Sequence, residues 1–308
     1  MKNQAKRKEL LNRTKRIVIK IGTNVISDKG KPLSSRIKNI VDNICKLNKC
    51  NKEIIIVTSG AVGYGAAVLM QKGMIPQTIP LKQACASVGQ PILMEHYKKF
   101  FEKNGFSVGQ ILLTNDILNK SNAYQNARNT IFTLLEKNCI PIVNENDTVS
   151  IDELKFGDND SLAAVVSLLI GADLCVLLSD IDGFYKDYKN KHKAKKLNIV
   201  TELNQDIVKE AKSKDSSFST GGMITKINAA KTLMEAGISM AIINGKQNGA
   251  LSNLFNDYDF GTIFYSDKKQ LSNTRAWLAK FAKPSGIISI DKGAYNALIH
   301  DGKSLLPS

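Results

Sequence analysis

Residues 142–170 read IVNENDTVSIDELKFGDNDSLAAVVSLLI, and this stretch guides the interpretation of the whole chain. It begins as an apolar strand at Ile142-Val143 and ends as an apolar helix over 161–170. Between them, positions 144–160 hold six acidic residues and three asparagines. Asp and Asn favour helix caps and turns, but carboxylates held between two core elements can also form a binding site. The stretch alone leaves both interpretations open.

Apolar strands alternate with helices on both sides of this stretch. Strands are expected within 16–23 and at 53–58, 108–113, 140–143, 174–178, 240–243 and 262–264. Helices are expected from Ser34 onward and at 81–103, with a break near 89–91, and at 123–137, 161–170, 203–213 and 222–236. This alternation predicts an α/β fold, a three-layer αβα sandwich around a mostly parallel sheet. Ligands of such sheets bind beyond the carboxyl ends of the strands.

The composition is that of a soluble globular protein, with 43% hydrophobic and 23% charged residues among 308. No apolar run is long enough to span a bilayer, and the basic N-terminus lacks the apolar core of a signal peptide. The five cysteines are odd in number and lie mostly in apolar patterns. We therefore expect reduced cysteines, a cytoplasmic location and no membrane partner.

The net charge of +15 is concentrated in three segments, at 1–16, 186–196 and 266–308. Either these are lysine-rich solvated segments or they contact nucleic acid. We favour solvated segments, because the remainder of the chain is electrically neutral.

Lys20 interrupts the apolar run Ile17-Val18-Ile19 one residue before the expected strand end at Ile21. An unpaired buried ammonium is costly, so this side chain either reaches solvent from an edge strand or meets an anion in the strand-end crevice. Gly22 would let that anion approach the backbone.

Two glycine-rich segments could bind anions. Residues 59–65, SGAVGYG, follow a strand but match neither the dinucleotide fingerprint nor a P-loop. Residues 220–226, TGGMITK, place two glycines and a lysine at the start of a helix, as a phosphate cradle requires, although a flexible loop would look similar. The three histidines are isolated, and no serine lies in a nucleophile elbow, so metal-histidine and serine-hydrolase chemistry are not expected.

Ten segments together resemble the amino acid kinase family over nearly all of 16–265. They are IVIKIGTNVI (17–26), IIIVTSGAVGYG (54–65), ASVGQ (86–90), VGQILLT (108–114), ARNT (127–130), IPIVNENDTVS (140–150), KFGDNDSLAA (155–164), LLSDIDGFY (177–185), FSTGGMITKINAA (218–230) and GTIF (261–264). The motifs NENDTV, GDNDSLAA and TGGMxTK are specific to the branch of the family that phosphorylates glutamate.

The resemblance implies a role for each matching position. Lys20 and Lys226 correspond to lysines that stabilise the transferring phosphoryl group, and Asp160 to the aspartate that positions them. The glutamate-binding positions are Ser59, Asp147 and Asn159. The ATP-binding positions, besides Lys20, are Ser179, Asp180, Thr220, Gly221, Gly222, Met223, Ile224, Thr225 and Lys226. Ser179 replaces a threonine of many members and keeps the hydroxyl. No dedicated metal ligands are expected, with Mg²⁺ held mainly through the ATP phosphates.

The implied reaction is ATP-dependent phosphorylation of the γ-carboxylate of L-glutamate to L-glutamyl 5-phosphate, the first step of proline biosynthesis. A homodimer or homotetramer, feedback inhibition by proline and functional coupling to glutamyl-phosphate reductase are also implied. Two alternatives remain. One is a related kinase for another small acid, and the other is a basic RNA-binding protein on an inactive kinase fold.

Three regions are expected. Residues 1–15 form a basic N-terminal tail, and residues 16–265 form the catalytic domain. Residues 266–308 resemble a linker and the opening of a PUA-like domain, either truncated or a remnant, and are expected to be poorly ordered or packed on the kinase domain.

Overall fold

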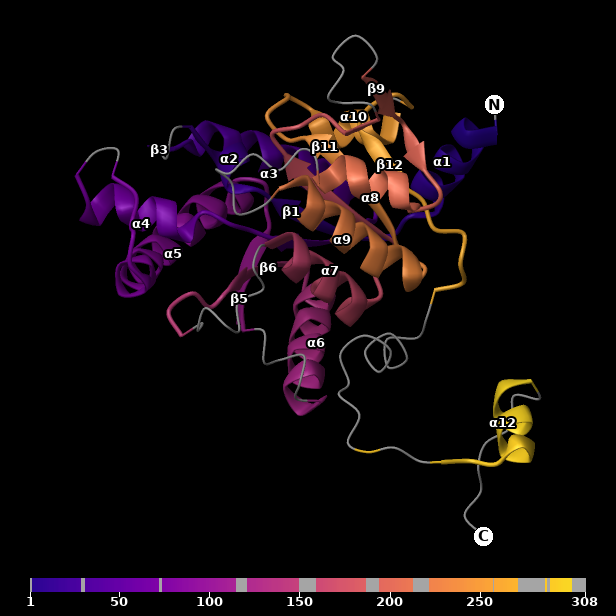
Figure 1. Ribbon diagram of the computed structural model, residues 1–308. Helices are drawn as coiled ribbons and strands as arrows, with labels where there is room; N and C mark the ends of the chain where they lie inside the picture. Colours follow the sequence, from indigo (N-terminus) through magenta and orange to yellow (C-terminus); the bar gives the residue numbers. More distant parts are fainter. Residues whose placement is uncertain are drawn as a thin grey trace.

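The computed structural model describes residues 2–28, 31–71, 74–114, 121–149, 159–186, 194–212, 222–256, 258–270, 286 and 289–300. An eight-stranded sheet forms the middle layer, in the order β10-β12-β11-β7-β1-β4-β6-β5 (Figure 1). Its strands are β1 (Arg16–Ile21), β4 (Glu53–Val57), β5 (Ser107–Leu113), β6 (Cys139–Glu145), β7 (Leu174–Ser179), β10 (Ile199–Val200), β11 (Ser239–Asn244) and β12 (Thr262–Phe264). All neighbouring strands are parallel except β11 and β12.

Helices cover both faces of the sheet, so the expected three-layer αβα architecture is confirmed (Figure 1). The helices are α1 (Lys2–Arg13), α2 (Thr23–Ile26), α3 (Ser34–Lys49), α4 (Ala61–Leu69), α5 (Ile79–Glu102), α6 (Ser121–Glu136), α7 (Asn159–Ile170), α8 (Gln205–Lys212), α9 (Met223–Glu235), α10 (Ala250–Asn256) and α12 (Lys292–Ile299). Two short strand pairs, β2 (Ser27–Asp28) with β3 (Lys31–Pro32) and β8 (Phe184–Lys186) with β9 (Lys195–Leu197), complete the described elements.

Two hydrophobic cores lie on opposite faces of the sheet because side chains alternate along each strand. In β1, Ile17 and Ile19 join the core beneath α3 and α5, while Val18 joins the core beneath α7 and α9. Lys20 has the parity of Val18 and therefore points toward α7 and α9. Strand β1 lies in the middle of the sheet, with Lys20 paired to Val57 and Leu177, so the edge-strand alternative is wrong.

The first fifteen residues contain a packed helix. Leu10 and Leu11 of α1 are buried, and the side chain of Arg7 is only 1% exposed. Arg7 donates hydrogen bonds to the backbone carbonyls of Asn198 and Phe260. These contacts fix α1 against the rest of the domain, a feature that the lysine-rich sequence did not reveal.

Helix α5 runs without interruption through Pro91, so the expected break near 89–91 is wrong. Pro91 removes one backbone hydrogen bond and leaves the carbonyl of Ser87 without its helical donor. Both residues are exposed, so water can satisfy that carbonyl. Continuity is reinforced by α4, whose backbone approaches α5 closely at Gly65 and Gly89.

Helix termini follow the sequence signals in part. Gly237, two residues beyond the end of α9, has φ +84°, and Ile238 donates its backbone N–H to the carbonyl of Leu233, as in a helix end with a left-handed glycine. Ser34 is the first residue of α3 rather than its cap, and its hydroxyl lies 3.2 Å from Nδ1 of His96.

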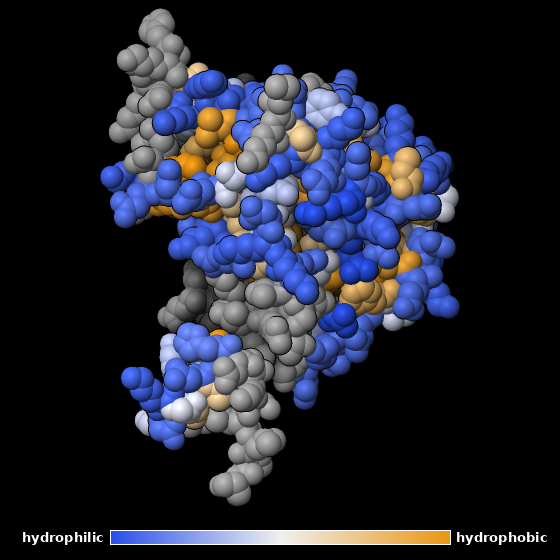
Figure 2. Space-filling view, turned by 90° about the vertical axis from the view of Figure 1, so that its right-hand side faces the viewer, coloured by the Kyte–Doolittle hydropathy of each residue, from blue (hydrophilic) through white to orange (hydrophobic). Residues whose placement is uncertain are grey.

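The surface of the described chain is mainly polar on the face shown in Figure 2, with several apolar patches between the hydrophilic areas. No helix in the described ranges is both long and apolar enough to cross a membrane. All five cysteines are free, and Cys50 is exposed. Most of 266–308 lies outside the described residues, and the described helix α12 contains no buried residue, so the interpretation of this region stays a prediction.

The contact between α4 and α5 yields a stability prediction. A Cβ at Gly89 would lie 1.9 Å from the carbonyl oxygen of Ala61, so Gly89→Ala must force the helices apart. We expect a loss of at least about 2 kcal/mol in the free energy of unfolding, measured by urea denaturation. Gly63→Ala is the matched control, since a Cβ there meets no atom within 4 Å, and it should leave the urea midpoint unchanged or raised. Equal midpoints for the two variants would contradict this packing account.

Candidate active site

The candidate site lies where the carboxyl ends of β1, β4, β6, β7 and β11 meet. These five strands are parallel neighbours, so the loops that follow them share one edge of the sheet. From β1 the chain turns first to β4 on one side and later to β7 on the other. This reversal of strand order around β1 opens the crevice in which ligands of such sheets bind.

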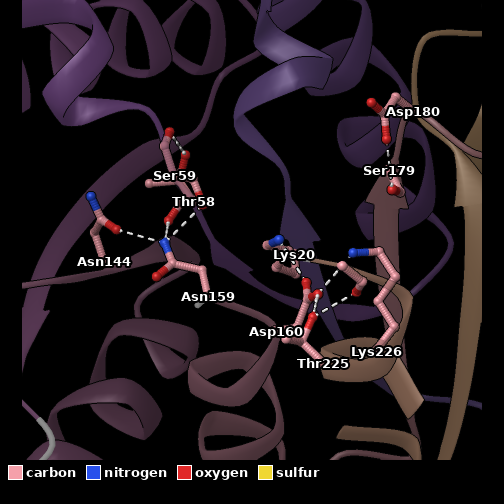
Figure 3. Close-up of polar contacts among 11 residues, drawn as sticks. Lys20, Thr58, Ser59, Asn144, Asn159, Asp160, Ser179, Asp180, Thr225 and Lys226 are labelled. Carbon is pink, nitrogen blue, oxygen red and sulfur yellow. Dashed lines mark hydrogen bonds and ion pairs between the residues drawn. The ribbon is translucent and has the colours of Figure 1, made fainter. Parts of the chain in front are cut away.

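One buried carboxylate lies at the centre of the crevice and contacts both lysines predicted from the sequence (Figure 3). Oδ1 of Asp160 is 2.6 Å from Nζ of Lys20, and Oδ2 of Asp160 is 2.9 Å from Nζ of Lys226. Asp160 is 0% exposed, and Lys20 and Lys226 are 9% and 6% exposed. The three residues come from β1, the first turn of α7 and the first turn of α9.

The charge balance of this cluster keeps the carboxylate ionised. Burial opposes ionisation, but the neighbouring charges of Lys20 and Lys226 outweigh it and hold the pKa of Asp160 below its ordinary value. Two ammonium groups then share one carboxylate, which leaves a net positive charge on a buried cluster. Such a centre attracts an anion that reaches both lysines.

The start of α9 adds a hydroxyl to the cluster. Thr225 donates a hydrogen bond to Gly222 O at 2.8 Å and lies 3.2 Å from Oδ2 of Asp160. Met223 is buried in the hydrophobic core, so it can offer a ligand only its backbone. Ile224 is partly buried against the same core. Thr220 and Gly221, predicted to bind ATP, lie outside the described residues.

A cluster of amides lies on one side of the charged centre (Figure 3). The side-chain nitrogen of Asn159 donates to the carbonyl oxygen of Thr58, to Oγ of Ser59 at 2.8 Å and to Oδ1 of Asn144 at 3.0 Å. Gly60, the N-cap residue just before α4, has φ +105°, a conformation that favours glycine and turns the chain sharply after Ser59. The structure thus brings Ser59 and Asn159 together.

Asp147, the third residue predicted to bind the acceptor, lies in the turn that follows β6. It is half-buried, two residues beyond the end of the strand, and therefore at the same edge of the sheet. Residues 150–158, which complete the acidic stretch, lie outside the described residues.

Ser179 and Asp180 lie on the other side of the charged centre, at the end of β7 (Figure 3). Oγ of Ser179 is 3.3 Å from Oδ1 of Asp180, and Nδ2 of Asn24 donates to Oδ2 of Asp180 at 3.0 Å. Burial opposes ionisation of Asp180, but the bond from Asn24 and the nearby charge of Lys246 hold its pKa below the ordinary value. The charged centre is therefore flanked by an amide cluster and by a hydroxyl-carboxylate pair.

Sequence reasoning did not single out four polar residues that support these side chains. They are Asn24, Gln90, Gln110 and Asn144. Each lies inside a motif that carries the family resemblance. In the same order, these motifs are IVIKIGTNVI, ASVGQ, VGQILLT and IPIVNENDTVS. A polar residue inside such a motif was the available signal, because amides carry no charge or periodicity that marks a site.

Comparison with known proteins gives the family. The sequence model of the amino acid kinase family matches residues 15–244. The chain belongs to the amino acid kinase family. A protein from Thermoanaerobacter sp. (strain X514) named glutamate 5-kinase is 42% identical over 295 residues, which cover 95% of this chain and 79% of the relative. Another from Geobacter sulfurreducens, also named glutamate 5-kinase, is 42% identical over 307 residues, covering 98% of this chain and 81% of the relative.

Solved structures share the fold at lower sequence identity. Carbamate kinase from Giardia aligns with a TM-score of 0.57 and 18% identity over 83% of this chain and 100% of its own. The isopentenyl phosphate kinase of T. acidophilum, in a product complex, aligns with a TM-score of 0.53 and 17% identity over 81% of this chain and 99% of its own. The fold shared with these structures therefore extends over most of the chain.

This kinase-family site can neutralise a transferring anion, since two buried ammonium groups converge on one crevice. In the described part of the chain, no three His, Cys, Asp or Glu side chains gather closely enough to hold a metal ion. The chemistry that these residues themselves offer is positioning and charge stabilisation.

The effect of Asp160→Asn on the free energy of unfolding tests the electrostatics of the cluster. Removing the shared carboxylate leaves two buried ammonium groups facing each other, and we expect a loss of roughly 3–5 kcal/mol at pH 7. Because the folded-state pKa of Asp160 is lowered, its contribution is complete above the unfolded value of about 3.9 and declines as the pH falls toward the folded value. Urea denaturation of both proteins at pH 7 and below about pH 4 should show a smaller difference at the acidic pH. A difference that is independent of pH would contradict this account.

Proposed function

We propose that the chain catalyses ATP-dependent phosphorylation of the γ-carboxylate of L-glutamate, giving L-glutamyl 5-phosphate and ADP in the first step of proline biosynthesis. The observation that carries the proposal is the buried Lys20-Asp160-Lys226 cluster, which lies between the amide cluster and the Ser179-Asp180 pair (Figure 3). The relatives named glutamate 5-kinase, which match over nearly the whole chain, support the choice of substrate.

The reaction needs no general base. A γ-carboxylate is already ionised at pH 7, so one of its oxygens attacks the γ-phosphorus of ATP directly. The bond from that phosphorus to the bridging oxygen breaks, and ADP leaves with the electron pair. Lys20 and Lys226 stabilise the charge on the transferring phosphoryl group, and Asp160 holds both ammonium groups in place. The lowered pKa of Asp160 suits this role, because a carboxylate that stays ionised keeps both ion pairs.

The nucleotide would be held by two segments. The 220–226 segment at the start of α9 would offer backbone N–H groups to the phosphates, with Lys20, Thr225 and Lys226 adding their side chains. Ser179 and Asp180, at the end of β7, would lie along the nucleotide. Mg²⁺ held through the ATP phosphates would supply further neutralisation of their charge.

The phosphoryl acceptor, glutamate, would be bound by Ser59, Asp147 and Asn159. The nitrogen of Asn159 is engaged by Thr58, Ser59 and Asn144, so its side-chain oxygen is the atom left to meet a ligand. An oxygen acceptor and a carboxylate, Asn159 and Asp147, suit the ammonium group of glutamate. The hydroxyl of Ser59 can donate to a substrate carboxylate.

The wider role of the protein follows from the same assignment. It would act in the cytoplasm as a homodimer or homotetramer, subject to feedback inhibition by proline. Glutamyl 5-phosphate is a reactive acyl phosphate, which favours functional coupling to glutamyl-phosphate reductase. RNA binding on an inactive fold is not favoured, because the charged cluster is intact. Another small acid is not favoured as the substrate, because the relatives that match nearly the whole chain are named glutamate 5-kinase.

A hydroxamate assay tests the substrate. With Mg-ATP, hydroxylamine and glutamate, the acyl phosphate should be trapped as a hydroxamate in a glutamate-dependent manner. Aspartate, N-acetylglutamate and UMP, assayed in parallel by ADP release, should give much lower turnover. If folded protein gave no glutamate-dependent signal, the proposal would be wrong. Higher turnover with another acceptor would identify that acceptor as the substrate.

Lys226→Ala tests the role of the second lysine. Its charge is needed most in the transition state, so kcat should fall by roughly a thousandfold while KM for glutamate changes little. Lys231→Ala, at an exposed position of the same helix, is the matched control and should retain the original kcat. An effect confined to KM would mean that Lys226 binds substrate without stabilising the transferring group.

A further inference from the structure

The amide of Asn159 belongs to a hydrogen-bonded chain that continues beyond the acceptor site. Asn144 donates from Nδ2 to Oε1 of Gln90 at 2.8 Å, and Gln90 donates from Nε2 to Oε1 of Gln110 at 3.1 Å. The chain therefore runs from Asn159 through Asn144 and Gln90 to Gln110. These residues lie on α7, β6, α5 and β5, so the chain links both layers of helices through the sheet.

Two backbone groups fix the direction of every amide in this chain. The carbonyl of Thr58 can only accept, so the nitrogen of Asn159 must face it. The backbone N–H of Glu145 can only donate, so Oδ1 of Asn144 must face it, at 2.9 Å. With Asn159 and Asn144 set in this way, Nδ2 of Asn144 has to find an acceptor on the side of α5, and Gln90 provides one.

Burial makes that acceptor important. Asn144 is 2% exposed and Gln90 is 8% exposed, so solvent cannot readily replace the bond between them. A buried donor without a partner is costly, and an Asn144 amide that turned over to avoid this would lose its bonds from Glu145 and Asn159. Gln110 is exposed, so the end of the chain is less constrained than its middle.

We infer that Gln90 is a positioning residue for the acceptor half of the site, acting through Asn144 to keep the side-chain oxygen of Asn159 directed at the substrate ammonium group. The inference rests on the proposed function, since it concerns how glutamate is oriented. This role accounts for a residue of the ASVGQ motif and, through Gln110, for one of the VGQILLT motif. Neither motif contains a phosphoryl-transfer residue. Gln90 touches neither substrate nor ATP in this account.

Steady-state kinetics of Gln90→Leu tests the inference. Leu has a similar volume but accepts no hydrogen bond from Asn144, so the glutamate site should lose its orientation. We expect KM for glutamate to rise about tenfold, which corresponds to about 1.4 kcal/mol, with KM for ATP within about twofold of the original. Gln90→Glu should restore KM for glutamate to within about threefold, because a Glu oxygen can still accept from Asn144.

Asn43→Leu is the matched control for removal of a buried amide. Asn43 is 7% exposed in α3 and is hydrogen-bonded to Asn39 and Ser252, within a different part of the fold. The Asn43→Leu substitution should lower the melting temperature and leave KM for glutamate and KM for ATP unchanged. If Gln90→Leu does not fold, Gln110→Met replaces it as the test, with an expected rise of about threefold in KM for glutamate alone.

The outcomes separate this inference from the proposed function. Wild-type protein without glutamate-dependent turnover would overturn both. Active wild-type protein with an unchanged KM for glutamate in Gln90→Leu, or with equal rises for glutamate and ATP, would overturn the positioning role alone. A rise of the same size in Asn43→Leu would also overturn it, since the effect would then reflect general loosening of the fold.

Discussion

The shared ion pair of Asp160 with Lys20 and Lys226 is the constraint on which the site depends. An isolated ammonium in the middle strand of a sheet would be expelled or neutralised, and here one carboxylate stabilises two of them. The carboxylate brings β1, α7 and α9 together at one point, from positions far apart in the sequence. Because two positive charges meet one negative charge, the cluster remains attractive to a phosphoryl group.

Asn159, the residue before Asp160 in the first turn of α7, belongs to the proposed acceptor side of the site. Asn159 faces Thr58, Ser59 and Asn144, while Asp160 faces the two lysines. Consecutive residues in the first turn of one helix thus connect the acceptor side to the phosphoryl side. Their fixed spacing suits a reaction that depends on positioning two reactants, since misplacement of either lowers the rate. Asn159 and Asp160 both belong to the acidic stretch 142–170.

Much of the fold could be predicted from the sequence because apolar periodicity reports burial directly. The strands around Lys20 and the helix 161–170 followed from such patterns, and their order gave the parallel sheet. The position of β1 within the sheet did not follow, since the same pattern fits an edge strand or a middle one. Pro91 was misinterpreted because a local rule was applied where packing against α4 and solvent access to Ser87 decide the outcome.

The residues of the site also fall into those that the sequence could reveal and those that it could not. A charged residue such as Lys20 stands out in an apolar run. The family resemblance then indicated its partners, Asp160 and Lys226. Gln90 carries no charge and lies on a helix, so only its contacts with Asn144 and Gln110 reveal it. The packing of α1 was also hidden, because it depends on a single buried side chain, Arg7, and two leucines in a lysine-rich segment.

The most direct test of the central claim is a crystal structure with ADP, Mg²⁺, glutamate and a planar phosphoryl mimic such as aluminium fluoride. We expect Nζ of Lys20 and Nζ of Lys226 both to lie within hydrogen-bonding distance, about 3 Å, of the mimic. Asp160 should remain between them, in contact with both. A complex in which either lysine lies beyond reach of the mimic, or in which Asp160 contacts the acceptor carboxylate itself, would contradict it.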